Sequence, residues 1–323
     1  MPTPPQIHLG RRWMLASSTL LALPGTALAR LTALPGASAP APHPLSSGSM
    51  PPELPAILAA IEARHGGRLG LSVSHLPSGE TWGWRASERF EPCSTYKALL
   101  AAWVLKCRDQ GRPVPDLLLP RKPRAGHSPF SQAHAGQRVS ALQLAQAMTE
   151  ESDNEAARTV LAHLGGTAVL ERFARDLGNP RFVFPGDPHL DPAMPASAVS
   201  VDALGMQVAM ARLATSDELL PASRTLWLRW LRRSQTGMRR LRAGWPARWL
   251  AGSKTGSGEG QSHDLALVMK ARHPEQVVFS VAAYWQSTAS AEQLPANDFE
   301  RREQALREVA AAMSGWMRGK DAL

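Results

Sequence analysis

The chain has 323 residues, 44% of them hydrophobic, and this length and composition are typical of a globular protein with a large core. Its formal net charge is +9, from 36 Lys+Arg and 27 Asp+Glu. No Lys/Arg tract is interleaved with aromatic residues, which disfavours a nucleic-acid-binding protein. We interpret the charge as a solvated, arginine-rich surface.

Residues 1–29 are predicted to be an export signal. Arg11 and Arg12 precede an apolar stretch that ends at Leu23, and the small residues of Ala27-Leu28-Ala29 predict cleavage after Ala29. The arginine pair resembles a twin-arginine signal, and an ordinary secretory signal is the alternative. The apolar stretch is too short for a membrane-spanning helix. A mature protein without a membrane span is therefore expected in the periplasm.

Residues 30–50 consist mainly of Ala, Pro and Ser. Such a segment buries too little apolar surface to offset the entropy that it would lose on ordering. We therefore predict a disordered tether between the signal and the folded part.

The first predicted elements after the tether are a helix and a hairpin. The helix lies near residues 55–64, and the hairpin joins an alternating strand at 69–75 to a second strand at 81–85 through the turn Pro77-Ser78-Gly79. A further helix is predicted over Thr95–Arg108.

The middle of the chain shows helical periodicity without a convincing strand, so it is predicted to be all-helical. Its five segments are residues 141–148, 155–164, 168–177, 201–213 and 222–231. Three strands and a final helix are then predicted at residues 249–254, 264–271, 277–285 and 298–313.

These elements predict an α/β domain built from both ends of the chain, with an all-α domain inserted between them. Strands from residues 51–92 and 220–316 are expected to share one antiparallel sheet flanked by helices. Residues 93–219 would form the helical domain. The boundary between the two domains is the expected place for a cleft.

The choice of lysine indicates where chemistry takes place. Only six of the 36 Lys+Arg residues are lysine, and two of them lie in Ser94-Thr95-Tyr96-Lys97 and Lys254-Thr255-Gly256. Arginine stays protonated, whereas a buried lysine can lose its proton and act as a base. A serine at a helix start lies where the helix dipole favours negative charge, and Lys97 lies one turn further on the same face. A helix cap with a solvated lysine is the alternative.

Two further motifs strengthen this interpretation. Ser152-Asp153-Asn154 follows Ser94 by 58 residues, and Lys254-Thr255-Gly256 follows after another 102. Taken singly, the first is also consistent with a turn or helix cap, and the second with a strand that turns at glycine. The ordered trio is the signature of serine beta-lactamases and penicillin-binding proteins.

With their flanks, residues 89–97, 151–157 and 252–256 resemble class A beta-lactamases, and the resemblance covers about residues 55–313. It implies a beta-lactamase/transpeptidase-like fold. It also implies Ser94 as the acyl-accepting nucleophile, Lys97 as its base, Ser152 as the group that passes a proton to the leaving nitrogen, and Asn154 as a ligand of the substrate amide.

The same resemblance implies how the rest of the substrate is held. Lys254 and Thr255 would bind its carboxylate, and the backbone amides of Ser94 and Ser257 would form an oxyanion hole. Many members add an arginine behind the carboxylate, where this chain has His263. We choose Arg240 as its replacement. Arg240 lies in residues 236–244, and the alternative is that all three arginines of this segment, Arg239, Arg240 and Arg242, face the solvent.

The loop that carries Glu-Pro-x-x-Asn in the family reads Asp187-Pro188-His189-Leu190-Asp191 here, with no glutamate between Glu171 and Glu218. An aspartate is one methylene shorter, and a base displaced by about 1 Å can lower a rate roughly 100-fold. Acylation is thus expected to survive while turnover suffers. Whether Asp187 is the base, or Asp191, or neither, stays open. No counterpart of the family's arginine–aspartate pair at this loop is recognisable.

Cys93 and Cys107 are the only cysteines. If the segment between them is helical, their Cα atoms are roughly 20 Å apart, beyond bridging distance. The class A members that hydrolyse carbapenems bridge the first position to a cysteine where this chain has Gly258, so Cys93 is expected to be a small buried residue.

The predicted function is a periplasmic class A-like serine beta-lactamase, an antibiotic-resistance enzyme that opens the beta-lactam amide through an acyl-serine intermediate. The expected partner is a small-molecule beta-lactam, and the expected state is a monomer. No HExxH-type spacing indicates a metal, and no cofactor is predicted. A slow-deacylating penicillin-binding or D-alanyl-peptide-processing protein is the main alternative, and a non-catalytic cell-wall ligand sensor is another.

Overall fold

The computed structural model describes residues 46–186 and 194–320, which belong to one compact unit. The export signal, Asp187 and Asp191 lie outside the described residues.

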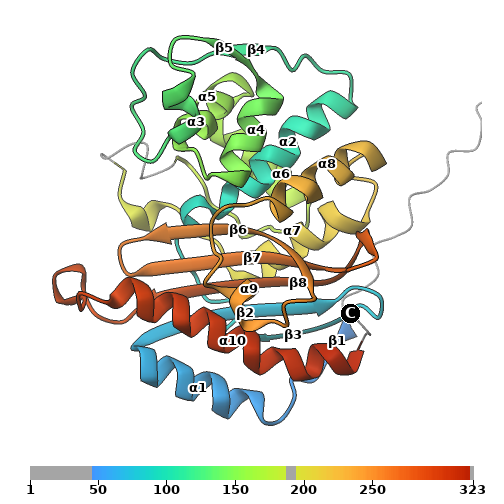
Figure 1. Cartoon of the computed structure of the whole chain (residues 1–323), viewed down its shortest axis with the longest axis vertical. Helices are drawn as coiled ribbons and strands as arrows, with labels where there is room; N and C mark the ends of the chain where they lie inside the picture. The colour runs from blue at the N-terminus through green and yellow to red at the C-terminus, as the bar shows by residue number, and fades with distance from the viewer. Residues whose placement is uncertain (1–45, 187–193, 321–323) are drawn as a thin grey trace, which may run out of the picture. The chain divides into compact units, whose positions relative to one another are not determined.

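The centre of the fold is a six-stranded sheet that joins the two ends of the chain (Figure 1). Its order is β1 (Ser46–Ser47), β3 (Glu80–Trp84), β2 (Gly67–His75), β8 (His273–Ser287), β7 (Gln261–Lys270) and β6 (Leu250–Gly258). All neighbours from β3 to β6 are antiparallel, and the prediction that strands from both ends share one sheet is confirmed.

The last residues of the predicted tether are ordered. Ser46 and Ser47 pair in parallel with Glu80 and Thr81, and the Gly48 amide donates to the Thr81 carbonyl at 2.9 Å. The prediction of disorder is therefore wrong from Ser46 onward. The reason is that backbone pairing with an open sheet edge requires no apolar side chain.

One face of the sheet is covered by helices α1 (Leu54–His65) and α10 (Asp298–Lys320), with the short α9 (Leu241–Gly244) beside α10 (Figure 1). The strands supply alternate residues to this layer, such as Leu69, Leu71 and Val73 of β2. The aromatic and aliphatic side chains here are almost fully buried, so this layer is a true core.

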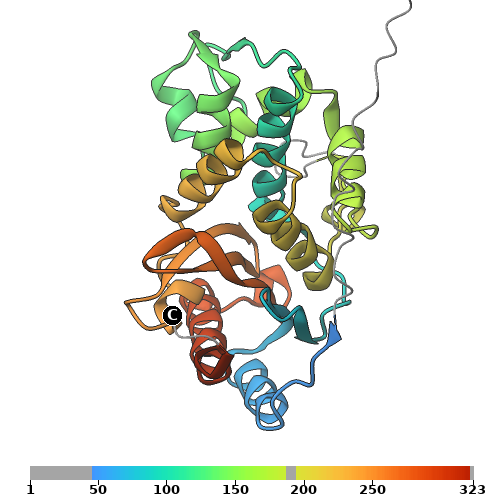
Figure 2. The same ribbon diagram turned by 90° about the vertical axis from the view of Figure 1, so that its right-hand side faces the viewer.

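Helices α7 (Ala203–Thr215), α2 (Lys97–Asp109) and α8 (Pro221–Arg232) belong to the second core, on the opposite face (Figure 2). The Trp227 indole of α8 is fully buried and donates to the Ala98 carbonyl of α2 at 3.0 Å. Since α2 begins at Lys97, directly after the turn that carries Ser94, this contact helps to fix the helix behind the predicted nucleophile.

The middle of the chain is largely helical, but it is not all-helical as predicted. Besides α3 (Pro129–Ala133), α4 (Ala141–Glu150), α5 (Asn154–His163) and α6 (Gly166–Asp176), it contains a two-stranded sheet of β4 (Asp116–Leu118) and β5 (Arg138–Ser140). Leu117 and Val139 face each other across this sheet, and both are buried. Strands of three residues are too short to show a period of two in the sequence.

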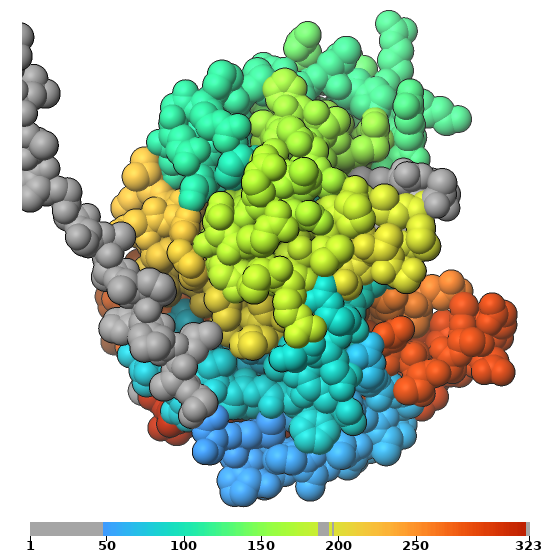
Figure 3. Space-filling model, turned by 180° about the vertical axis from the view of Figure 1, so that it is seen from behind, coloured from blue at the N-terminus to red at the C-terminus, as the bar shows by residue number. Residues whose placement is uncertain are grey.

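From behind, in Figure 3, the yellow-green residues that include α6 lie between the green helical part and the cyan and blue residues of the first strands and α1. Among the described residues, no helix is both long enough and apolar enough to cross a membrane.

Candidate active site

Ser94 lies in a tight 3-10 turn, η1 (Cys93–Tyr96), that leads directly into α2. Cys93 before it has φ = 45°, a left-handed conformation that is uncommon for a residue with a Cβ. The turn is pressed against β6, since a Cβ on Gly256 would lie 2.9 Å from the Pro92 carbonyl oxygen and 3.0 Å from Cys93 Cβ. Glycine at the end of Lys254-Thr255-Gly256 is therefore what lets the strand approach the serine.

Lys97 is fully buried one turn after Ser94. Its Nζ lies 3.0 Å from Ser94 Oγ and 2.8 Å from the Ser152 carbonyl oxygen, and it also contacts Asn154 Oδ1. These contacts exclude the alternative of a helix cap with a solvated lysine. They also join the first two sequence motifs.

Ser152 and Asn154 are held by the start of α5. Asp153 is the N-cap of this helix, because its carboxylate accepts from the Ala156 amide at 2.7 Å, and it is buried with a second partner in Ser131. Ser152 has φ = 62°, so its backbone is also left-handed. The anchored Asp153 maintains this strained turn, which points Ser152 toward the third motif.

Lys254 is buried on β6 and joins the second and third motifs. Its Nζ donates to Ser152 Oγ at 2.9 Å and to the Thr255 carbonyl oxygen at 2.8 Å. Burial places the pKa of Lys254 well below its usual range, the positive charges of Lys97 and Arg240 lower it further, and Asp264 opposes the shift.

Arg240 is only 2% exposed and lies beside the same strand. Its guanidinium donates to the carbonyl oxygens of Gly256 at 2.8 Å and His263 at 2.7 Å, and to Ser257 Oγ at 2.6 Å. The neighbouring Arg239 side chain is 71% exposed, so the alternative that every arginine of this segment faces water does not apply to Arg240.

His263 does not line the active-site cavity, although it occupies the strand position where many family members have an arginine. It is fully buried, and burial together with the nearby Arg240 lowers its pKa to about 3. Its Nδ1 accepts from the Trp285 amide at 3.3 Å, and its Nε2 lies 3.2 Å from Gln261 Oε1. It is a neutral core histidine.

The motif residues surround a cavity of about 490 Å³. Its lining contains Ser94, Ser152, Asn154, Thr255, Ser257 and Arg240, which the sequence predicted, and His127, Thr236, Gly237, Phe299 and Glu303, which it did not. Thr236 and Gly237 belong to the same segment as Arg240. For His127, Phe299 and Glu303 the sequence carries no recognisable signal, because they come from a loop and a helix whose periodicity does not reveal what they face.

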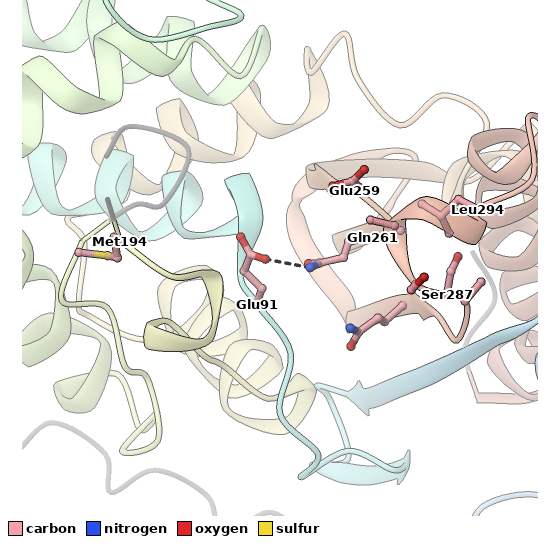
Figure 4. A pocket seen from close by; sticks show the side chains of 11 residues that line it. Glu91, Met194, Glu259, Gln261, Ser287 and Leu294 are labelled. Carbon is pink, nitrogen blue, oxygen red and sulfur yellow. Dashed lines mark hydrogen bonds between the residues drawn. The ribbon is translucent and has the colours of Figure 1, made fainter. Parts of the chain in front are cut away.

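A neighbouring pocket of about 470 Å³ lies at the turn after β6 (Figure 4). Gln261 links several groups here. Its Nε2 donates to Glu91 at 2.8 Å, while its Oε1 accepts from Cys93 Sγ at 3.2 Å and from His263. Cys93 and Cys107 form no disulfide with each other and both are buried, as expected for Cys93. Gln261 thus braces the turn behind Ser94.

The loop that contains Asp187 and Asp191 is closed at its base by contacts that the sequence analysis missed. The carboxylate of Asp202 lies 3.1 Å from Arg181 Nε and 3.3 Å from Arg89 Nη1. Val183 and Ser200 also form a backbone bridge between the two sides. The chain therefore has arginine–aspartate pairs here, and the expectation that it lacks one is wrong. The sequence does not reveal these pairs because the two arginines lie outside the loop motif and 92 positions apart.

The site combines a serine hydroxyl beside a buried lysine, a second serine hydroxyl that accepts from a second buried lysine, and an arginine in the cavity lining. This combination defines a serine hydrolase of the acyl-transfer type. Among the described residues, no group of three or more His, Cys, Asp or Glu is arranged to hold a metal ion.

Comparison with known proteins identifies the family. The model of the beta-lactamase enzyme family matches residues 53–315. Beta-lactamase OXY-1 of Klebsiella oxytoca is 32% identical over 257 residues, covering 77% of this chain and 88% of that protein. The crystal structure of a beta lactamase from Burkholderia vietnamiensis is 32% identical, covers 83% of this chain and 98% of its own, and has a TM-score of 0.74. A class A beta-lactamase of the last common ancestor of Gram-negative bacteria is 35% identical, covers 80% and 97%, and has a TM-score of 0.72.

The chain belongs to the beta-lactamase enzyme family, as a class A serine beta-lactamase. Its activity is hydrolysis of the beta-lactam amide.

Proposed function

We propose that this hydrolysis proceeds through an acyl-enzyme on Ser94, with the roles below. The observation that carries the proposal is the 3.0 Å contact between Lys97 Nζ and Ser94 Oγ inside a buried site. A nucleophile and a base within hydrogen-bond reach, with the base held by further groups, are what covalent acyl transfer requires.

In the acylation step, Lys97 takes the proton of Ser94 Oγ as that oxygen bonds to the lactam carbonyl carbon. The carbonyl oxygen becomes an oxyanion, which accepts from the backbone amides of Ser94 and Ser257. When the tetrahedral intermediate collapses, the lactam C–N bond breaks and its nitrogen takes the proton of Ser152. The 2.9 Å contact with Lys254 allows that hydroxyl to be reprotonated.

The substrate carboxylate is assigned to the cavity wall formed by Thr255 and Arg240, with the buried ammonium of Lys254 next to Thr255 on β6. Thr255 Oγ1 already bonds Thr236 Oγ1 at 2.7 Å, which orients its hydroxyl. Arg240 supplies a guanidinium that is held against Ser257. Asn154, which lines the cavity and contacts Lys97, is assigned to the substrate's amide side chain.

Deacylation requires a water and a base on the loop. The chain has no glutamate there, and we propose Asp187 for this role from its place in Asp187-Pro188-His189-Leu190-Asp191. Turnover is then expected to be slower than acylation.

We also propose that residues 1–29 are cleaved after Ala29, that the mature enzyme works in the periplasm as a monomer, and that residues 93–219 form a helical domain within the chain. The Arg11-Arg12 pair followed by an apolar stretch supports the export signal.

The test of Ser94 is intact-mass spectrometry after addition of benzylpenicillin. Wild type should gain one penicilloyl adduct, Ser94→Ala should gain none, and Ser49→Ala, which changes an exposed serine, should behave as wild type. An unmodified wild type across several beta-lactams would refute the nucleophile. A persistent adduct with almost no hydrolysis of a chromogenic cephalosporin would favour the slow-deacylating penicillin-binding alternative.

A further inference from the structure

A carboxylate lies buried behind the third motif. Asp264 of β7 is opposite Thr255 of β6 in the sheet register, and none of its surface is exposed to solvent. It does not line the cavity and does not belong to any of the three motifs. An isolated buried charge is unfavourable, so its surroundings have to be explained.

The contacts of Asp264 reach the segment of residues 236–242, which carries Arg240. Its Oδ2 accepts from the Leu241 amide at 3.3 Å. Gly237, at φ = 75°, lies so close that a Cβ there would be 2.4 Å from Thr255 Cγ2 and 3.7 Å from Asp264 Oδ2. The segment is therefore seated on Thr255 and Asp264, and Arg240 extends from it to Ser257.

The charges around Asp264 are mostly positive. Arg240 and Arg242 interact with it electrostatically from the 236–242 segment, and Lys254 does so from β6. Lys97, when it is protonated, adds another positive charge near Lys254. The other acid of the cluster is Glu303 of α10, whose Oε1 lies 3.4 Å from Arg240 Nε.

Neutral groups complete its surroundings. The adjacent His263 is uncharged, because its pKa is about 3. The Ser253 hydroxyl lies close enough to donate to the Asp264 carboxylate, which favours its charged form.

We propose that Asp264 is a positioning residue for the carboxylate-binding wall: it seats the 236–242 segment and keeps Lys254 charged, and so controls the affinity for substrates that bear a carboxylate. This inference rests on the proposed assignment of Lys254 and Arg240 to that carboxylate. Burial already favours a neutral Lys254, and the negative charge of Asp264 counteracts it.

The effect depends on pH in a defined direction. Burial is the main cause that raises the pKa of Asp264, to about 6, and Arg240 and Arg242 oppose it. Above pH 6 the carboxylate is charged and supports the Lys254 ammonium. Below pH 6 it becomes neutral and, like an asparagine, places no negative charge beside Lys254. The contribution of Asp264 is thus expected only above about pH 6.

The test compares Asp264→Asn with wild type on benzylpenicillin and on its methyl ester, which lacks the carboxylate. Asparagine keeps the shape and an acceptor for the Leu241 amide but loses the charge. For the acid we expect KM to rise at least about 10-fold at pH 8, the loss expected for a hydrogen-bonded charge, with a smaller change in kcat. The difference from wild type should vanish below pH 6, and the ester should be hydrolysed equally by both.

Asp109→Asn is the matched control, because Asp109 is a largely buried carboxylate that accepts from the Leu220 amide at the far end of α2. This substitution should leave the ratio of kcat/KM for the acid to kcat/KM for the ester unchanged. If the role of Asp264 were merely structural, Asp264→Asn would lower kcat/KM for the acid and for the ester together at every pH. That result would overturn the inference. If wild type forms no acyl-enzyme, the proposed function fails instead, so the two failures are distinguishable.

Discussion

Lys254 Nζ and Ser152 Oγ lie 2.9 Å apart, although 102 positions separate the two residues in the sequence. This single contact joins the sheet to the helical part across the cavity. It also places the Lys254 ammonium next to two groups: the Ser152 hydroxyl, which is proposed to protonate the lactam nitrogen, and the site proposed for the substrate carboxylate.

Replacement of Lys254 by alanine should therefore impair binding and acylation together. We expect kcat/KM for benzylpenicillin to fall at least about 30-fold, as for the loss of a buried, hydrogen-bonded charge. Lys270→Ala, at the other end of the neighbouring strand β7, should keep the wild-type value. Single-turnover acylation rates would check the prediction, and an unchanged rate would remove Lys254 from the proton path.

Arg240 and Arg239 form a natural pair for comparison, because they are adjacent and differ in burial. Arg240→Ala should raise KM for penicillins about 10-fold or more, since a hydrogen-bonded guanidinium is lost from the cavity wall. Arg239→Ala should leave KM unchanged. Equal effects of the two substitutions would show that only the overall positive charge matters.

The loop aspartate is predicted to govern deacylation. Asp187→Asn should leave the rate of adduct formation intact and lengthen the life of the acyl-enzyme, followed by mass spectrometry after quenching at successive times. Asp187→Glu restores the missing methylene and should raise kcat, by up to about 100-fold if reach limits the base. The substitutions Asp191→Asn and Asp191→Glu serve as the control. If only the Asp191 variants respond, the base is Asp191.

Asp264 should lower the stability of the fold at neutral pH. Its pKa in the folded state, about 6, lies above the ordinary value of 3.8. The folded state therefore binds the proton more tightly, and the stability that this provides is complete below pH 3.8 and lost as the pH rises through 6. Asp264→Asn should unfold at a higher temperature than wild type at pH 8 and at nearly the same temperature at pH 4. A lower melting temperature at pH 8 would contradict the predicted sign.

Hydrophobic periodicity is sufficient to predict the strands β2, β3, β6, β7 and β8 and the long helices, because the core selects alternate residues in β2 and one face in α10. The three motifs could be found because each combines reactive residue types at short spacing. Their meeting around one cavity followed from the resemblance. The structure adds the contacts of Lys97 and Lys254.

The remaining features depend on contacts that sequence spacing does not encode. Phe299 and Glu303 line the cavity only because the first turns of α10 lie beside the 236–242 segment. The pairs of Asp202 with Arg181 and Arg89 form between irregular segments, where no period reports which residues face each other. The strands β4 and β5 are short and far apart in sequence.

The pairing of β2 with β8 has a consequence for the biogenesis of the enzyme. Gly67 is opposite Ser287, so the middle of the sheet cannot close until the chain has left the ribosome as far as Ser287. Such distant pairing makes folding slow, and unpaired edges stay open to aggregation meanwhile. We therefore expect a chain truncated before β8 to be insoluble rather than partly active, and newly made enzyme to depend on chaperones until β8 has been synthesised.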